Sequence, residues 1–223
     1  MIKVFAINGS PKLNKGRTAL ILNPFLEGMR EAGAEIELFY ASKLKISPCI
    51  GDFICWDEKP GKCIINDDMQ MLYPKLRNAD ILVLATPVYV PLPGNFQNFL
   101  NRIIPLMEPV LRIQAGGRTR AMFRKDVNIS KIVLVSTCGW WEKGNFGTVI
   151  RIAKEFAKDI NVELAGAVLR PHSDYLGKDN KKTMRVFENC KQAGYQLVKE
   201  GKFHNETLKA IGSPLVSRKK YVD

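Results

Sequence analysis

Five short apolar segments alternate with helical patterns along this chain, and this order constrains the fold more than any other feature. The segments cover residues 2–8, 35–40, 81–86, 131–137 and 162–169. The first is short and shows no polar alternation, as expected of a strand buried on both faces of a parallel sheet. Strands that alternate with helices predict a parallel sheet with right-handed crossovers.

The segments between these strands have the periodicity of amphipathic helices. In the first, residues 18–31, apolar side chains repeat at i, i+3, i+4 and i+7, namely Leu22, Phe25, Leu26 and Met29. Pro24 lies inside this helix and predicts a kink or a later start. Further helices are expected near residues 95–104, 149–160 and 186–197. We therefore predict an α/β, flavodoxin-like three-layer fold, with a five-stranded parallel sheet in order 2-1-3-4-5 and helices on both faces.

The segment lengths predict a single domain over residues 1–200 with two insertions. The insertions cover residues 41–66 and 108–130, and long insertions commonly form lids, binding loops or dimer contacts. Residues 201–223 form a polar, basic tail that we expect to dock loosely or on a partner subunit. Asp67 and Asp68 precede a short helix and are interpreted as its N-cap and a first-turn acid.

Composition excludes several classes of protein. No apolar run approaches the roughly 18 residues of a membrane span, and the N-terminus lacks the order of a secretory signal, so a cytoplasmic protein is expected. The formal net charge of +12 would attract nucleic acid, but the basic residues are spread along the chain without a nucleic-acid-binding motif. Five cysteines, an odd number, argue against a disulfide framework.

Three loops are predicted to meet where ligands bind to open α/β sheets, outside the carboxyl ends of the strands. The first loop, residues 8–18, combines hydroxyls, an amide and cations ahead of a helix, which is the chemistry of a phosphate site. Its candidate residues are Ser10, Lys12, Asn14, Arg17 and Thr18. The loop matches neither G-x-x-x-x-G-K-[ST] nor G-x-G-x-x-G. A simple helix cap would explain Thr18 but not the other four residues.

The second and third loops supply surfaces for a flat ligand. The second, residues 86–95, brings Tyr89 and three prolines to the rim, where the ring suits a heteroaromatic ligand; a proline-rich turn over the core is the alternative. In the third, residues 137–145, Gly139 permits close approach of backbone N–H groups. Trp140 and Trp141 either contact the ligand or pack at a subunit interface.

Three motifs in register resemble the NAD(P)H-dependent FMN reductase family, most closely its iron–sulfur flavoprotein branch and the cluster-free relatives. They are GSPK…GRTALILNPFLEGMREAGAEIEL, PCIGDFICW…GKCIINDDMQ and ATPVYVPLPGNFQNFLNR, within about residues 1–105. The resemblance implies a flavodoxin-like fold, bound FMN, and a homodimer or dimer of dimers with the flavin near the subunit interface. It implies a phosphate site at Ser10, Lys12, Gly16, Arg17 and Thr18. It implies that the isoalloxazine ring is held by Pro87, Val88, Tyr89 and the backbone of Thr137, Cys138 and Gly139.

Two positions depart from the family pattern. Arg17 stands where the phosphate loop commonly has asparagine, so a cation replaces an amide there. In the cluster-binding branch, a C-x2-C-x2-C run is followed by a fourth cysteine, but here Asp52 stands in the second position, between Cys49 and Cys55, with Cys63 fourth. Three thiolates and a carboxylate match the Cys₄ preference of such clusters poorly. We therefore expect no metal site.

The resemblance predicts an FMN-dependent NAD(P)H oxidoreductase that passes electrons from a nicotinamide through bound FMN to an unidentified second acceptor. The chemistry belongs to the flavin, so no side chain is named as catalytic. A flavodoxin-type carrier that serves a protein partner is one alternative, and a non-redox nucleotide- or nucleic-acid-binding module is another. His172 and His204 are interpreted as surface or loop residues and receive no role.

Overall fold

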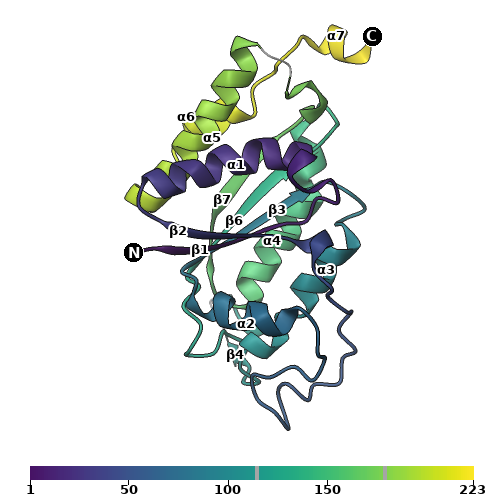
Figure 1. The fold of residues 1–223 in the computed structure, drawn as a ribbon, viewed down its shortest axis with the longest axis vertical. Coiled ribbons are helices and arrows are strands. Elements are labelled where there is room, and N and C mark those ends of the chain that lie inside the picture. Colours follow the sequence, from purple (N-terminus) through teal and green to yellow (C-terminus); the bar gives the residue numbers. More distant parts are fainter. Residues whose placement is uncertain (114–115, 178–179) are drawn as a thin grey trace.

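A twisted parallel sheet forms the centre of the computed structural model, which describes residues 1–113, 116–177 and 180–223 (Figure 1). Its strand order is β2-β1-β3-β6-β7. The bounds of these strands in chain order are β1 (Lys3–Asn8), β2 (Glu35–Tyr40), β3 (Ile81–Pro87), β6 (Lys131–Thr137) and β7 (Glu163–Arg170). Counted alone, these five strands have the predicted order 2-1-3-4-5.

Residues on β1 show why the sheet is buried on both faces. Val4 and Ala6 pack into one core cluster and Phe5 and Ile7 into another, because successive side chains of a strand point to opposite faces. All four are at most 2% exposed. An unalternated apolar run is therefore what this strand requires, as predicted.

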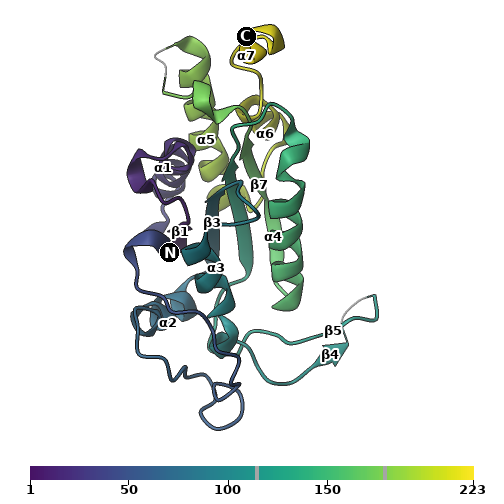
Figure 2. The ribbon, with the colours of Figure 1, turned by 90° about the vertical axis from the view of Figure 1, so that its right-hand side faces the viewer.

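Helices cover both faces of the sheet (Figures 1 and 2). The first face is covered by α1 (Arg17–Glu31) and α5 (Lys181–Glu200), whose apolar side chains join the cluster of Val4 and Ala6. The other face is covered by α2 (Met69–Asn78), α3 (Gly94–Asn101) and α4 (Gly147–Asp159), which contribute to the cluster of Phe5. The predicted three layers are thus present.

Shorter elements complete the chain. A two-stranded antiparallel arm, β4 (Arg112–Ile113) and β5 (Thr119–Arg120), lies in the second insertion and projects from the body below α4 (Figure 2). Two helices follow α5 at the C-terminal end, α6 (Asn205–Ile211) and α7 (Arg218–Val222). Single 3-10 turns are η1 (Leu13–Lys15), η2 (Ala41–Lys43), η3 (Ile104–Leu106), η4 (Lys143–Phe146) and η5 (Ser173–Tyr175). None of the helices in the described part of the chain is long and apolar enough to cross a membrane.

Pro24 does not delay the start of α1, so that part of the prediction is wrong. The helix begins at Arg17 and runs through Pro24 to Glu31. Proline removes one backbone hydrogen bond from a helix, but Ile21, Leu22 and Phe25 around it are fully buried. Tertiary packing of the buried face therefore maintains the helix despite the missing bond.

Asp67 is not a simple helix-cap residue but half of a buried ion pair. Arg102 Nη1 and Nη2 donate to the two carboxylate oxygens of Asp67, at 2.7 and 3.1 Å, and the side chains of the pair are 1% and 6% exposed. Ser47 and Met69 donate backbone N–H groups to the same carboxylate. The pair therefore ties the cysteine-containing insertion, which precedes α2, to the end of α3.

Candidate functional site

The three predicted loops meet at the carboxyl edge of the sheet. Gly9 N donates to Ala85 O at 2.7 Å, which joins the first loop to β3. Val88 N donates to Thr137 O at 2.9 Å, which joins the second loop to the third. The hydroxyls of Thr18 and Thr137 share a buried hydrogen bond of 2.9 Å. These contacts between distant segments bring the candidate residues together.

Ser10 organises the first loop. Its backbone N–H donates to Asn8 Oδ1 at 2.8 Å, and its hydroxyl accepts from Lys12 N at 3.4 Å. Gly16 caps α1, and a Cβ added there would stand 2.5 Å from Ser10 Oγ, so only glycine lets the chain pass this close to the serine. The loop then brings the start of α1 to the sheet edge, where Ala19 N donates to Gly16 O at 3.0 Å and the helix N–H groups before it lack intrahelical acceptors.

The cations of the first loop occupy different environments. Lys12 and Asn14 are exposed. Arg17 Nη1 donates to Leu176 O at 2.7 Å, and Arg17 Nε lies 3.8 Å from Asp174 Oδ1. The guanidinium thus binds the η5 turn, whereas Lys12 is exposed, as is Lys15, and its backbone N–H bonds to Ser10.

A buried donor at the base of the loop tests whether these residues fit the cofactor. Asn8 is fully buried, and its Nδ2 has no hydrogen-bond acceptor among the described residues. A buried polar group without a partner costs about 1–3 kcal/mol, so an acceptor is expected at this edge. The anionic or carbonyl oxygens of FMN are acceptors, and the donor set of this loop fits them.

The second loop presents mixed polar and apolar surface. Pro87 ends β3, and Val88 behind it is partly buried. Tyr89 is 48% exposed, and its N–H donates to Pro91 O at 3.2 Å. The tyrosine ring is therefore available at the rim to cover a flat ligand.

The third loop is held by β7 and the turn after it. Cys138 N donates to Arg170 O at 3.0 Å, and Ser173 N donates to Cys138 O at 2.9 Å. Burial raises the pKa of the Cys138 thiol, whose sulfur accepts from Trp140 N at 3.4 Å. Cys138 is therefore a structural thiol beneath the loop, and Thr137 is the residue of this loop that bonds to the other two, through Val88 N and the Thr18 hydroxyl.

His172 lies in the loop after β7, as one of the two expected placements has it, but it is not a surface residue. It follows β7, is 1% exposed and adopts the left-handed conformation with φ of 36°. The ring is stacked on Trp141 at 4.6 Å between centroids. Its burial depends on the C-terminal segment, and no local sequence pattern around position 172 indicates that contact.

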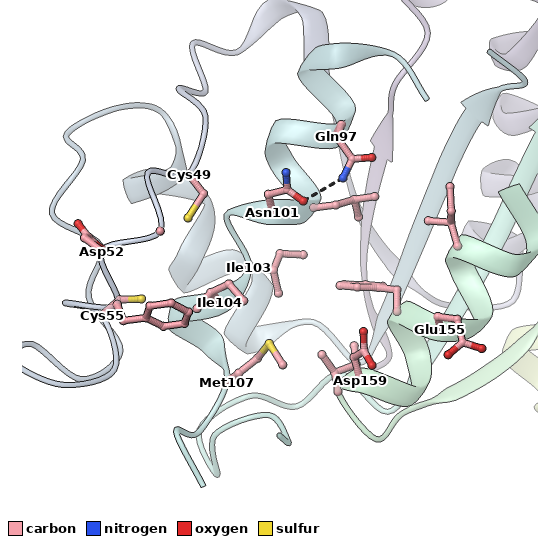
Figure 3. A pocket seen from close by; sticks show the side chains of 16 residues that line it. Cys49, Asp52, Cys55, Gln97, Asn101, Ile103, Ile104, Met107, Glu155 and Asp159 are labelled. Carbon is pink, nitrogen blue, oxygen red and sulfur yellow. Dashed lines mark hydrogen bonds between the residues drawn. The ribbon is translucent and has the colours of Figure 1, made fainter. Parts of the chain in front are cut away.

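The cysteines of the first insertion lie at a different place. Cys49, Asp52 and Cys55 line an apolar cavity of about 570 Å³ between this insertion, α3 and α4 (Figure 3). Burial, together with Cys63, Asp52 and Cys49, raises the pKa of Cys55 to about 11. Among the described residues, no three His, Cys, Asp or Glu side chains are grouped so as to hold a metal ion. The lining of this cavity contains none of the candidate flavin residues.

Comparison with known proteins gives one family and one fold. Residues 2–145 match the family model described as NADPH-dependent FMN reductase. An iron–sulfur flavoprotein of Methanocaldococcus jannaschii is 38% identical over 121 residues, which cover 52% of this chain and 60% of that protein. The chain spans about half the length of the curated relatives it matches, with 52% and 47% covered in two others.

Solved structures share the fold at low sequence identity. An NAD(P)H:quinone oxidoreductase from Methanothermobacter marburgensis superposes with a TM-score of 0.60 at 14% identity, covering 88% of this chain and 98% of that one. An FMN-dependent NADH-azoreductase from Bacillus anthracis, in complex with FMN, gives 0.60 at 12% identity, covering 89% of this chain and 100% of that one. These likenesses support the flavodoxin-like architecture.

Proposed function

The chain belongs to the NADPH-dependent FMN reductase family, and on that premise we propose that it is an FMN-dependent oxidoreductase that draws electrons from a nicotinamide. FMN is its cofactor, as supported by the family match and by its flavoprotein relatives. The observation that carries the proposal is the meeting of three loops around a helix N-terminus and a buried, unpartnered amide, Asn8 Nδ2. That combination suits an anionic ligand with a flat polar ring.

The phosphate end of the site is assigned to the first loop. The first-turn N–H groups of α1 and the Ser10 hydroxyl supply neutral donors, and Thr18 stands at the start of the helix. Lys12 supplies a positive charge and Asn14 an amide, while Gly16 keeps the loop close to Ser10. Arg17 is engaged with the η5 turn, so it contributes to phosphate binding through the positive field of the loop.

The ring end is assigned to the second and third loops. Pro87, Val88 and Tyr89 provide an apolar edge with one exposed aromatic ring. The backbone of Thr137, Cys138 and Gly139 provides polar groups at close approach. FMN held there would supply the redox chemistry, hydride uptake from a nicotinamide and electron transfer to a second acceptor. The protein residues orient the ring and restrict water, and none is assigned an acid–base role.

We propose further that the chain holds no [4Fe–4S] cluster, although its relatives are named iron–sulfur flavoproteins. Asp52 occupies the position of a second cysteine ligand, and its carboxylate Oδ1 accepts from Ile54 N at 3.3 Å. The carboxylate is thus used within its own turn. An iron–sulfur cluster prefers thiolate ligands, and only three are available in this insertion.

We also propose a homodimer. The arm β4–β5 and the two residues that follow Pro109 carry exposed apolar side chains, Val110, Leu111 and Ile113, which are 53%, 64% and 78% exposed. Contiguous exposed apolar surface commonly marks an interaction site. A second copy of the chain is the partner proposed for this arm.

The test of the proposed function is anaerobic mixing of FMN-loaded protein with NADH or NADPH. The visible flavin band should bleach at least as fast as steady-state turnover, and initial-rate plots should give the parallel lines of a ping-pong scheme. Flavin that is reduced quickly by a reduced protein donor, and slowly by both nicotinamides, would favour the carrier. Protein that ignores FMN but shifts labelled oligonucleotides would favour the nucleic-acid-binding module.

A further inference from the structure

Arg170 is a buried cation that is satisfied by carbonyl groups. It ends β7 and is 0% exposed. Its Nε donates to Pro171 O at 2.8 Å, and its Nη1 donates to Ile211 O and Ser213 O at 2.6 and 2.8 Å. Burial lowers the pKa of Arg170 to about 10, and no carboxylate among the described residues pairs with it. The guanidinium therefore fixes the end of α6 and the residues after it onto the sheet edge.

His172 makes a second attachment to the same C-terminal segment. Leu215 N donates to His172 Nε2 at 3.1 Å, and Arg170 Nη2 also approaches this nitrogen. Both groups are donors, so Nε2 is the acceptor and we assign the ring proton to Nδ1. Nδ1 is buried without an acceptor among the described residues. A protonated ring would place a third donor against these two, so the attachment requires neutral histidine.

The same turn holds the third loop of the candidate flavin site. His172 N donates to Trp140 O at 2.8 Å, next to the bonds between Cys138 and the turn described above. The C-terminal segment then reaches this loop directly. Tyr221 Oη in α7 donates to Gly139 O at 3.0 Å, and Arg218 pairs with Glu142 at 3.1 Å. Figure 2 shows α7 beyond the end of the sheet, where this loop lies.

From these contacts we propose that Arg170 and His172 are positioning residues that fix residues 211–221 as an outer support for the Thr137–Gly139 loop, and so set the affinity for the flavin ring. The inference rests on the proposed function, because it takes this loop as part of the FMN site. One side of the loop is bonded to β7 and the turn after it, and the carbonyl of Gly139 is bonded to the C-terminal segment. Releasing the segment frees Gly139 and exposes Trp141.

Acid pH should release the segment in the native chain. Burial, and then the neighbouring Arg170, lower the pKa of His172 to about 4. A histidine with a depressed pKa contributes stability above its ordinary pKa of about 6.5 and loses it as the pH falls toward the folded value. The groups that face the ring are Arg170, Trp141 and Tyr221. The nearby acids Glu142 and Asp174 are paired with Arg218 and Arg17.

The experiment compares flavin affinity and attachment of the segment in four proteins: wild type, His172→Ala, His172→Gln and Tyr221→Phe. His204→Gln is the matched control, since the other histidine of the chain pairs with Glu200 on the surface. We expect His172→Ala to weaken both FMN and riboflavin by about 5- to 100-fold, because a buried donor loses its partner. Both ligands carry the ring that this loop holds. His172→Gln keeps an acceptor and should recover part of the loss.

Attachment of the segment is read separately, from limited proteolysis after α6 and from tryptophan emission, without any need for flavin. His172→Ala should be cleaved faster at neutral pH, and wild type should reach the same cleavage rate only as the pH falls from about 6 toward 4. Tyr221→Phe removes one hydroxyl, so it tests the Gly139 contact even if His172→Ala fails to fold; it should weaken both flavins by several-fold. His204→Gln should match wild type in both measurements.

The two proposals fail differently. Wild type that binds no FMN contradicts the proposed function and this inference with it. Wild type that binds FMN, with His172→Ala and Tyr221→Phe binding equally well, contradicts the inference alone. Loss of FMN affinity with riboflavin affinity retained would also contradict it, because the effect would then lie at the phosphate.

Discussion

Lys12 and Arg17 show how two cations in one loop acquire different roles. They are five positions apart, and in the sequence both are positively charged residues at the start of a predicted helix. In the fold, the Arg17 guanidinium donates to Leu176 O, and Lys12 remains exposed beside Ser10. Local sequence pattern does not reveal a carbonyl partner 159 residues away, so the sequence predicts a phosphate loop here but cannot separate the roles of its two cations.

We predict that Lys12→Ala weakens FMN by roughly 10- to 150-fold, since a hydrogen bond to a charged group is worth about 1.5–3 kcal/mol. Riboflavin has the same ring without the phosphate, so its affinity should hardly change. Lys15→Ala removes an equal charge from the same loop and is the control. The measurement is a pair of flavin titrations for each variant. Equal losses from Lys12→Ala and Lys15→Ala would mean that general charge, rather than a phosphate contact, is responsible.

Arg17→Ala should behave differently from Lys12→Ala. The change detaches α1 from the η5 turn, so we expect FMN and riboflavin to weaken by similar factors. The same titrations measure this effect. A loss confined to FMN would show instead that Arg17 leaves the turn to meet the phosphate.

At the scale of elements, the local pattern of apolar residues predicts the bounds of the strands and the main helices to within a few residues. Strands 35–40 and 131–137 have the bounds predicted for them. The second is an apolar run typical of a buried strand, and the first alternates polar and apolar residues, as an edge strand does. The Asp67–Arg102 pair was missed, since it joins residues 35 positions apart. Burial of His172 was also missed, because residues 43 positions later cover it. Polar contacts between residues far apart in the chain leave no periodic pattern in the sequence, so the sequence alone does not predict them.

The Asp67–Arg102 pair leads to a prediction for stability. Burial alone would raise the pKa of Asp67, but bonds from Arg102, Ser47 and Met69 hold it below its ordinary value. The pair therefore stabilises the fold above about pH 4, and this contribution is lost as the pH falls further. Asp67→Asn should lower the free energy of unfolding by about 3–5 kcal/mol at neutral pH, since it leaves Arg102 buried and unpaired.

The neighbouring Asp68 provides the matched control. Its carboxylate accepts from Lys45 N at 2.7 Å and has no such ion pair in the described residues. Asp68→Asn should cost no more than about 1.5 kcal/mol in urea denaturation at neutral pH. If Asp67→Asn and Asp68→Asn were equally stable, the ion pair of Asp67 would contribute no more to stability than the backbone hydrogen bond of Asp68.

At the scale of the whole molecule, the basic charge and the projecting arm bear on assembly. A net charge of +12 opposes self-association, so a dimer needs a specific apolar contact. The arm supplies exposed apolar side chains, and its second strand and the residue before it are held to α4 by Arg118–Glu155 and Arg120–Asp159. An arm anchored in this way, with apolar side chains exposed, is suited to contact a second copy.

Replacing an arm residue tests this assembly. Ile113→Asp should shift the mass in solution from dimer toward monomer at a given protein concentration, because it places a charge in the proposed contact. Light scattering on the size-exclusion peak measures the change. Val222→Asp, at an exposed apolar residue of α7, is the control and should keep the wild-type mass. A monomeric wild type, or an unchanged Ile113→Asp variant, would rule out the arm as the contact.

The absorption spectrum of the purified chain, before and after reconstitution with FMN, tests the central claim most directly. The account predicts a flavin spectrum with about one releasable FMN per chain. It predicts no broad iron–sulfur absorption beneath that spectrum, because Asp52 interrupts the cysteine set. A chain that retains no flavin and takes up none on titration would contradict the account, and iron with labile sulfide near cluster stoichiometry after anaerobic purification would contradict its assignment of the cysteines.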